Sequence, residues 1–311
     1  MSAVIQVKHL TKDFKELKAV NDLTFTVEAG QVYGFLGQNG AGKSTTIRML
    51  LTLIKPTSGE IEIFGLNLFK HRKEILRQVG AIIERPDLYK YLTALENLRI
   101  FAAMSGVKVT RLKLMEQLEI VGLAGREHSK VKTYSQGMKQ RLGIAIALVH
   151  DPKLIILDEP TNGLDPQGIA DIRNLIISLS KEMKKTLLIS SHLLGEMELI
   201  ADSMIIIDKG RKVVEGKVNE LFDPSETVVE LKTTDDALVY EKLLQSDLQK
   251  TVKGIRNDCI LLKLHRDEIP GVLKQLVQME LGILSFNSRH SLEDYFLSLT
   301  TGKEYVDLTA H

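Results

Sequence analysis

One short segment, Gly37 to Ser44, constrains the fold of this chain more than any other part of its sequence. It reads Gly-Gln-Asn-Gly-Ala-Gly-Lys-Ser, which fits the phosphate-binding pattern Gly-x4-Gly-Lys-Ser/Thr. A β-like run, Val32 to Phe35, precedes it, and a helical run, Thr45 to Leu53, follows it. Backbone N–H groups in such a loop wrap a phosphate at the start of a helix, where the helix dipole favours anions. The spacing differs from the Gly-x-Gly-x-x-Gly of dinucleotide-binding folds.

The last residues of this segment carry its chemistry. Lys43 adds a positive charge for the β- and γ-phosphates, and the hydroxyl of Ser44 is expected to ligate Mg²⁺. The other predicted nucleotide-binding residues are Gly37, Gln38, Asn39, Gly40, Ala41, Gly42 and Thr45. The alternative is a glycine-rich turn without a ligand.

A second element ends in two adjacent carboxylates. The run Leu154 to Leu157 has the composition of a buried strand and leads directly into Asp158 and Glu159. Strands of a parallel sheet present reactive groups at their carboxyl ends. Asp158 is expected to hold Mg²⁺, and Glu159 to act as general base on the attacking water. The alternative is that Asp158 and Glu159 only end a strand and have no catalytic role. Because the same chain contains the phosphate-binding pattern, the catalytic role is favoured.

Composition excludes few classes of protein but narrows the partners. The chain has 311 residues, 44% of them hydrophobic, with 41 Lys and Arg against 40 Asp and Glu, so overall charge gives no reason to expect nucleic acid. The single cysteine, Cys259, is expected to be a buried strand residue and fits a reducing compartment. No run of residues has the length of a membrane span or a signal peptide.

The order of patterns predicts two domains. Strand-like runs alternate with helical patterns up to the hairpin signal Asp208 to Gly210, which predicts an α/β domain with a mainly parallel sheet over residues 1–224. The segment from about residue 87 to residue 150 is helical in pattern and is expected to form an inserted helical subdomain. The strand-like runs are Ile5 to Val7, Thr24 to Val27, Val32 to Phe35, Ile61 to Phe64, Leu154 to Leu157, Leu187 to Ser190 and Met204 to Ile207.

Residues 225–311 are expected to form a small α+β domain. The patterns give strand, helix, two strands, helix and strand, the order of a split β-α-β unit of ferredoxin-like type. A closing helix is expected from Ser291, capped with Asp294. The predicted elements are Val228 to Leu231, Ala237 to Leu244, Thr251 to Ile255, Ile260 to Leu264, Glu268 to Met279 and Ile283 to Phe286.

With these motifs in place, the sequence from about Val4 to Leu221 resembles the ATP-binding subunits of ABC transporters. The family carries a Leu-Ser-Gly-Gly-Gln signature before the Asp-Glu strand. Here Ser135 and Gly137 fit that signature, whereas Gln136 and Met138 depart from it. The resemblance implies that two copies meet head to tail and that the signature of each closes on the γ-phosphate held by the other. The alternative for Ser135 is a plain helix N-cap.

The resemblance assigns three further residues. Asp165 corresponds to the loop that crosses the dimer interface, His192 to the switch histidine at the γ-phosphate, and Phe14 to the aromatic residue that stacks on adenine. The alternatives are a surface turn for Asp165, a structural histidine for His192, and a buried strand-end ring for Phe14.

Glu84 departs from the family pattern, in which a glutamine contacts Mg²⁺ and the attacking water. Glutamate at this place resembles the subgroup that exports bacitracin-like and lantibiotic peptides. A carboxylate can ligate Mg²⁺, but its negative charge near the phosphates must be offset. The alternative is a surface glutamate. In the family a membrane partner docks beside this loop, so Asp87 to Leu98 is expected to line the docking groove, although most of its apolar residues are expected to pack the helical subdomain.

The resemblance therefore implies an ATP-hydrolysing subunit, with ATP and Mg²⁺ as cofactors, of a transporter that exports antibiotic peptides or drugs. The expected partners are a separate multi-span membrane permease and a second copy of the chain. The expected location is cytoplasmic, on the inner face of the membrane. The alternative class is a soluble ABC ATPase that remodels nucleic acid or ribosomes. A phosphate-loop kinase is more remote, because it gives no reason for the signature, His192 and Glu159 to occur together.

Overall fold

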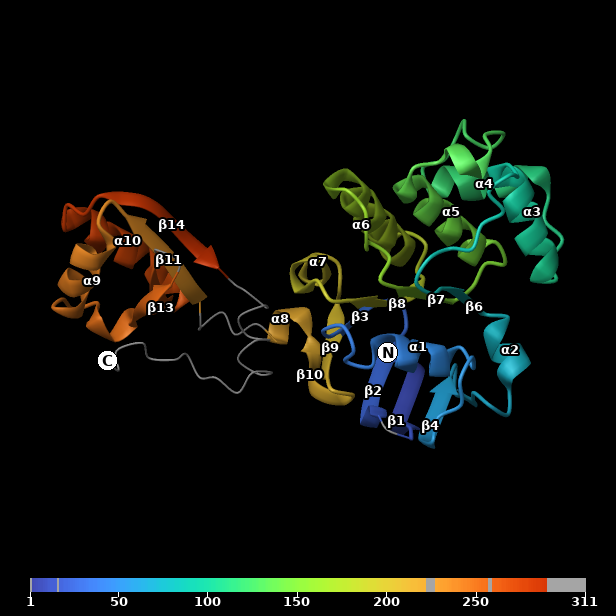
Figure 1. Cartoon of the computed structure of the whole chain (residues 1–311), viewed down its shortest axis with the longest axis horizontal. Helices are drawn as coiled ribbons and strands as arrows, with labels where there is room; N and C mark the ends of the chain where they lie inside the picture. Colours follow the sequence, from blue (N-terminus) through green and yellow to red (C-terminus); the bar gives the residue numbers. More distant parts are fainter. Residues whose placement is uncertain (1, 16, 222–226, 257–258, 290–311) are drawn as a thin grey trace. The chain divides into compact units, whose positions relative to one another are not determined.

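The computed structural model describes residues 2–15, 17–221, 227–256 and 259–289, and it divides into two compact units, Met1–Val218 and Asn219–His311 (Figure 1). The closing helix predicted from Ser291 lies outside the described residues.

The first unit contains a six-stranded sheet in the order β10-β9-β3-β8-β7-β6. All neighbours are parallel except the hairpin of β9 and β10, which confirms the prediction of a mainly parallel sheet. Every residue of β3, β7 and β8 is buried, because helices and a second sheet cover both faces of these strands. The strands are β3 (Val32–Leu36), β6 (Val79–Ile82), β7 (Leu154–Asp158), β8 (Thr186–Ser191), β9 (Ser203–Asp208) and β10 (Arg211–Lys217).

The second sheet is antiparallel, with the order β2-β1-β4-β5. Its strands are β1 (Ala3–Phe14), β2 (Leu17–Glu28), β4 (Ser58–Ile63) and β5 (Leu66–Asn67). The predicted strand-like runs near the N-terminus belong here, and the sequence pattern did not separate them from the parallel sheet. Helix α1 (Lys43–Leu50) buries Ile47, Met49 and Leu50 in a core shared with both sheets, which fixes the start of this helix against the end of β3.

The helical subdomain lies beside β6 and β7 in the first unit (Figure 1). It consists of α3 (Ala94–Met104), α4 (Arg111–Ile120) and α5 (Gln136–Leu148), as the helical pattern predicted. Thr93 and Glu96 form a capping box at the start of α3. Helix α5 packs so closely on β6 that a Cβ at Gly80 would lie 2.2 Å from the carbonyl oxygen of Ala147.

The remaining elements of this unit are shorter or lie along the main sheet. They are α2 (Arg72–Leu76), the 3-10 turn η1 (Val131–Thr133), α6 (Pro166–Lys181), α7 (Leu194–Glu198) and α8 (Val218–Leu221), which runs across the boundary between the units. Pro166 occupies the first turn of α6, where a missing N–H costs nothing.

The second unit has a four-stranded antiparallel sheet with the order β12-β13-β11-β14. Strand β13 thus lies between β11 and β12, the strand order of a split β-α-β unit. The elements are β11 (Thr227–Thr233), α9 (Asp236–Leu244), η2 (Gln249–Thr251), β12 (Val252–Arg256), β13 (Cys259–Leu264), η3 (Arg266–Glu268), α10 (Ile269–Gln278) and β14 (Ile283–Arg289). Cys259 opens β13 but is only partly buried, so the expectation of a buried cysteine is wrong.

In the described parts of the chain, no helix combines the length and the apolar character that a membrane crossing requires.

Substitution of Gly80 by alanine tests the close packing of α5 on β6. The added methyl group meets backbone rather than a movable side chain, so Gly80→Ala is expected to lower the free energy of unfolding by about 2 kcal/mol. Chemical denaturation of the full chain measures the change. Gly195→Ala in α7 is the matched control, because a Cβ there has no heavy atom within 4 Å. Equal stability of the two variants would contradict the packing.

Candidate active site

The loop between β3 and α1 has a backbone that only glycine accommodates at two positions. A Cβ at Gly37 would lie 2.4 Å from the carbonyl oxygen of Ile207, and one at Gly42 would lie 2.5 Å from that of Ala19. Gly42 also has a φ of 106°, in the left-handed region, and precedes α1 without a side-chain cap. A helix start without a side-chain cap leaves its first N–H groups able to receive an anion, and the binding of phosphate here stays a prediction.

The remaining loop residues surround this helix start. Gln38, Asn39 and Gly40 are exposed, Ala41 is buried, and Ser44 and Thr45 are partly buried on the first turn of α1. The first half of the loop, residues 38–40, is thus exposed to solvent, whereas residues 41–43 are buried.

Lys43, the first residue of α1, is a buried cation with an exposed fraction of only 5%. Its Nζ donates to the carbonyl oxygens of Gly37, at 2.7 Å, and Gln38, at 3.3 Å. The same Nζ lies 3.1 Å from Oε1 of Glu159, an ion-pair contact that lacks hydrogen-bond geometry. A buried charge needs such partners, so these contacts hold the ammonium group inside the loop.

Asp158 ends β7 and is almost fully buried, with 1% of its surface exposed. Ser190, its register partner on β8, donates its hydroxyl to Oδ1 of Asp158 at 2.5 Å. Oδ2 of Asp158 is buried without a hydrogen-bond partner. Because buried carboxylate oxygens are nearly always paired, this free oxygen fits a cation ligand, as expected for Mg²⁺.

Ser190 is a site residue that the sequence reasoning missed. Besides bonding Asp158, its hydroxyl and carbonyl oxygens both accept from the backbone N–H of Glu159, at 2.9 and 3.2 Å. The signal that locates it is the parallel register of β7 and β8, which the one-dimensional pattern does not contain.

Glu159 contacts the predicted catalytic residue His192 and the predicted nucleotide-binding residue Lys43. Its Oε2 lies 2.7 Å from Nδ1 of His192, and its Oε1 lies beside Lys43. The residue has a φ of 50°, an unusual value for a glutamate, which is the kind of backbone strain that occurs at functional sites. Lys43, Glu159 and His192, from three separate segments, therefore meet at one edge of the sheet.

The structure does not bring Glu84 into this cluster. Its backbone leaves the sheet beside that of Glu159, since each follows by two residues the paired positions Ile82 and Leu157. The side chain, however, forms an ion pair with Arg48 of α1 and is 63% exposed. Among the described residues, no group of three or more His, Cys, Asp or Glu side chains is arranged to hold a metal ion.

The signature residues form the beginning of α5. The hydroxyl of Ser135 accepts from the backbone N–H of Met138 at 3.2 Å, which makes Ser135 the N-cap, followed by Gln136 and Gly137 in the first turn. Asp165 caps α6 in the same manner, accepting from the N–H of Gly168 at 2.9 Å. The structure of one chain thus gives both residues a capping role.

Phe14 lies at the end of β1 and is 46% exposed, so the alternative of a buried ring is wrong. The Nζ of Lys12 lies 4.8 Å from the centre of its ring. An exposed aromatic face with a neighbouring cation is a surface on which a base can stack.

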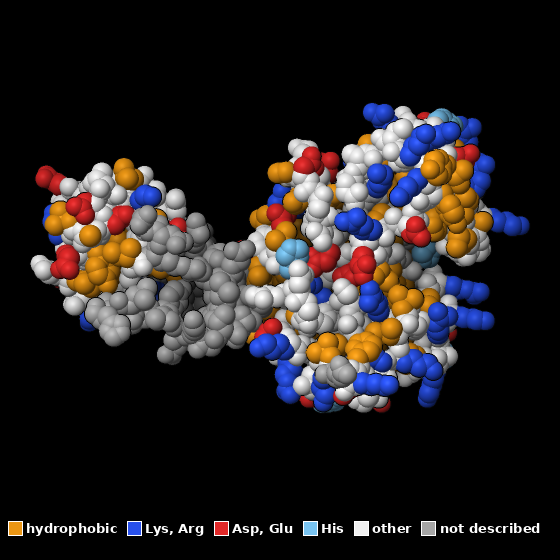
Figure 2. Space-filling view, in the orientation of Figure 1, with side chains coloured by type: hydrophobic (Ala, Val, Ile, Leu, Met, Phe, Trp, Pro, Cys, Tyr) orange, Lys and Arg blue, Asp and Glu red, His pale blue; other side chains and the backbone are white. Residues whose placement is uncertain are grey.

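The loop that follows Glu84 is anchored by a buried asparagine. The side-chain amide of Asn97, in α3, accepts from the N–H of Tyr89 and donates to the carbonyl oxygens of Tyr89 and Thr93. Leu88 is buried, whereas Tyr89 and Tyr91 are 49% and 79% exposed. Figure 2 shows exposed hydrophobic side chains over the helical subdomain, framed by Lys and Arg. The sequence reasoning had given Asn97 no role of its own.

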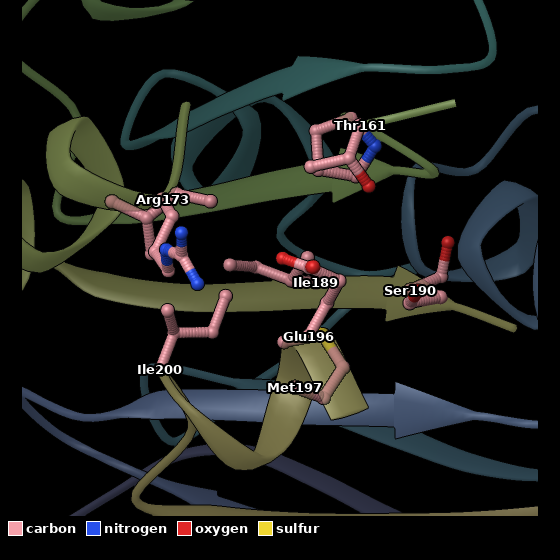
Figure 3. Close-up of a pocket in the computed structure, with 10 residues that line it drawn as sticks. Thr161, Arg173, Ile189, Ser190, Glu196, Met197 and Ile200 are labelled. Carbon is pink, nitrogen blue, oxygen red and sulfur yellow. The ribbon is translucent and has the colours of Figure 1, made fainter. Parts of the chain in front are cut away.

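A small cavity of about 10 Å³ lies behind the catalytic edge, between β8, α6 and α7. Figure 3 shows Arg173 from α6 and Glu196 from α7 directed into it, with Ser190 at one end. This volume accommodates about one water molecule, so the cavity is not the nucleotide site.

The fold and this cluster define an ATP-binding cassette, and the chain belongs to the ABC transporter family. The family model described as ABC transporter matches residues 20–162, which include the phosphate-binding loop, the signature and the Asp-Glu pair. The chain is thus an ABC ATPase that binds and hydrolyses ATP.

One relative is similar over nearly the whole chain, and another over about three quarters of it. The bacitracin transport ATP-binding protein BcrA of Bacillus licheniformis is 45% identical over 97% of this chain and 99% of its own. The lantibiotic transport ATP-binding protein SrtF of Streptococcus pyogenes is 41% identical over 77% of this chain and 99% of its own.

Solved structures agree with this assignment. The ATP-binding subunit of an ABC transporter superimposes with a TM-score of 0.62 at 34% identity, covering 70% of this chain and 91% of the other. A dimeric ATP-binding cassette in a post-hydrolysis state, bound to ADP and Pi, gives a TM-score of 0.62 at 26% identity, covering 69% of this chain and 98% of the other.

Ser190→Ala tests the hydrogen bonds that hold the carboxylate edge. The substitution leaves a buried, charged carboxylate without its hydroxyl donor, and we expect a loss of about 2 kcal/mol in the free energy of unfolding. Ser191→Ala is the control: this serine is also buried, and its hydroxyl accepts from the backbone N–H of Leu193, so about 1 kcal/mol is expected. Urea unfolding of both variants gives the comparison, and a smaller loss for Ser190→Ala would contradict the assignment.

Proposed function

We propose that this chain energises a separate multi-span membrane permease that exports antibiotic peptides or drugs. The observation that carries the proposal is the catalytic cluster of Lys43, Glu159 and His192, in a chain that matches a bacitracin transport protein from end to end. The alternative of a soluble ATPase that remodels nucleic acid or ribosomes is not favoured, because the relatives BcrA, similar over 97% of the chain, and SrtF, similar over 77% of it, are named for transport.

In the proposed reaction, one oxygen of Glu159 accepts a proton from water while the water oxygen bonds to the γ-phosphorus of ATP. The bond from the γ-phosphorus to the β–γ bridging oxygen breaks, and this oxygen leaves with ADP. Lys43 stabilises negative charge on the β- and γ-phosphates. His192, which contacts Glu159 at 2.7 Å, holds the carboxylate in place and reaches the γ-phosphate. In this proposal, the positive charge of Lys43 is already inside the loop before the phosphates of ATP bind there.

Magnesium is the proposed metal. Ser44 and the unpaired Oδ2 of Asp158 would hold it, and Glu84 is the further ligand that we propose. When bound, the ion supplies positive charge to the phosphate oxygens. The residues present fit this ion, because a hydroxyl and carboxylate oxygens are the ligands that it prefers.

The second proposed partner is another copy of the chain. Ser135, Gln136, Gly137 and Met138 of one copy would close on the γ-phosphate held by the other, and Asp165 would lie at the interface between them. The dimeric neighbour supports this arrangement. ATP then joins the two copies, and hydrolysis at Glu159 separates them.

Exposed aromatic side chains support the proposed contacts with adenine and with the permease. Phe14 offers its open ring face to adenine. Tyr89 and Tyr91 are exposed on the loop where we propose that the permease docks. With a membrane partner, the location that we propose for the chain is the cytoplasmic face of the membrane.

Glu159→Gln tests the general base. The amide keeps the shape of the side chain but cannot accept the proton, so ATP turnover is expected to fall by at least about a hundredfold while Mg·ATP binding persists. Phosphate release measures turnover, and size-exclusion chromatography with Mg·ATP is expected to show an accumulated dimer. Glu119→Gln, an exposed change on α4, is the control and is expected to leave turnover unaltered. Unchanged turnover in Glu159→Gln would remove Glu159 from its role.

Purification from detergent-solubilised native membranes tests the partner. A tagged copy of the chain is expected to retain a multi-span protein, identified by mass spectrometry, and Tyr89→Glu with Tyr91→Glu is expected to reduce the yield of that protein. Both tyrosines are exposed, so these changes leave the core intact. Ribosomal proteins in place of a membrane protein would support the alternative function.

A further inference from the structure

Helix α1 carries a cation near each end, and each cation has a different carboxylate as its partner. Lys43, the first residue, lies 3.1 Å from Glu159, and Arg48, in the last turn, forms an ion pair with Glu84. Each carboxylate comes two residues after a paired position of the neighbouring parallel strands β6 and β7, Ile82 for Glu84 and Leu157 for Glu159, and both have positive φ, 58° for Glu84 and 50° for Glu159. Two glutamates at matching positions of the sheet therefore have different cations of the same helix as their partners.

The two positions differ in exposure. Glu159 is 16% exposed and its partner Lys43 is 5% exposed, whereas Glu84 and Arg48 are 63% and 43% exposed. Asp158, the proposed magnesium ligand, is 1% exposed. A carboxylate paired in solvent with Arg48 is not at a buried metal site. For Glu84 to reach a metal ion beside Asp158, its bond to Arg48 must break.

We propose that Arg48 is a positioning residue that holds Glu84 outside the nucleotide site and competes with the magnesium ion for it. This inference rests on the proposed function, in which Glu84 is a magnesium ligand. Arg48 also offsets the charge of Glu84, which would otherwise repel the incoming phosphates. Binding of Mg·ATP then moves the carboxylate of Glu84 from Arg48 to the metal ion. Because Glu84 precedes the loop with the exposed Tyr89 and Tyr91, this exchange also moves the segment where we propose that the permease docks.

The weakness of the pair suits this role. An exposed ion pair contributes so little that its loss changes an equilibrium by about two- to fivefold, so a metal ion can displace Arg48 readily. A buried pair of the kind formed by Lys43 and Glu159 would resist such exchange.

The test compares the affinity of the purified full chain for a non-hydrolysable ATP analogue with Mg²⁺ and with EDTA, by titration calorimetry. The dissociation constant with EDTA divided by that with Mg²⁺ gives the gain in nucleotide affinity that the metal ion provides. The affinity of the free nucleotide for Mg²⁺ is the same for every variant, so it cancels when the ratios of two variants are compared. Arg48→Gln is expected to raise the gain from Mg²⁺ by about two- to fivefold, because the competitor is removed. Arg48→Lys, which keeps the charge but loses the planar fork, is expected to lie between Arg48→Gln and the wild type.

Two further variants decide whether Arg48 acts through Glu84. In the Glu84→Gln background, adding Arg48→Gln is expected to leave the ratio unchanged, since no carboxylate remains to compete for. Arg77→Gln removes an exposed charge at the end of α2 and is expected to behave as the wild type. An unchanged ratio in Arg48→Gln, or an equal change with and without Glu84, would overturn the proposal. A wild-type chain that binds the analogue equally well with and without Mg²⁺ would overturn the magnesium site itself.

Discussion

The ammonium group of Lys43 is the constraint on which the rest of the catalytic edge depends. It is buried, so it needs partners, and the loop carbonyls and Glu159 supply them. Burial of this charge is possible only because two glycines let the loop pass within van der Waals contact of Ile207 and Ala19. In the described part of the chain no side chain caps the start of α1, so its first N–H groups are open to the phosphate that we propose there.

The carboxyl ends of parallel strands assemble the other half of the site. Strands β7 and β8 align Asp158 with Ser190, and the turn after β8 carries His192 to Glu159. Strand β6 delivers Glu84 to the same level of the sheet, but the cation of α1 that it meets is Arg48 rather than Lys43. Sheet register therefore pairs Asp158 with Ser190 and brings Glu84 level with Glu159, while the two cations of α1 have different glutamates as their partners. The helical subdomain connects to this edge through Asn97, whose buried amide bonds the backbone of Tyr89 in the loop that follows Glu84.

Much of this could be read from the sequence. The Gly37 to Ser44 segment identified the phosphate-binding loop because its chemistry is local: the glycines, the lysine and the flanking strand and helix all lie within one stretch of chain. The hydrophobic run before Asp158 likewise gave a strand and its reactive end. Strand β1 and its antiparallel partners were predicted as strands but not as a separate sheet, since short apolar runs do not reveal which neighbours they pair with. Cys259 was expected to be buried, and a buried ring was the alternative for Phe14, yet each lies at one end of a strand, where exposure depends on neighbours distant in sequence.

By itself, then, the sequence determined the chemistry of this protein: the phosphate loop, the Asp-Glu pair, the helix cap at Ser135 and the order of the α/β elements are all written in residues close to one another along the chain. The tertiary structure alone decided which charges meet. The contacts of Glu159 with Lys43 and His192, of Glu84 with Arg48, and of Asp158 with Ser190 span from 32 to 116 positions along the chain. Such pairings follow from strand order and register, which depend on packing of the whole sheet and leave no local signal in the sequence.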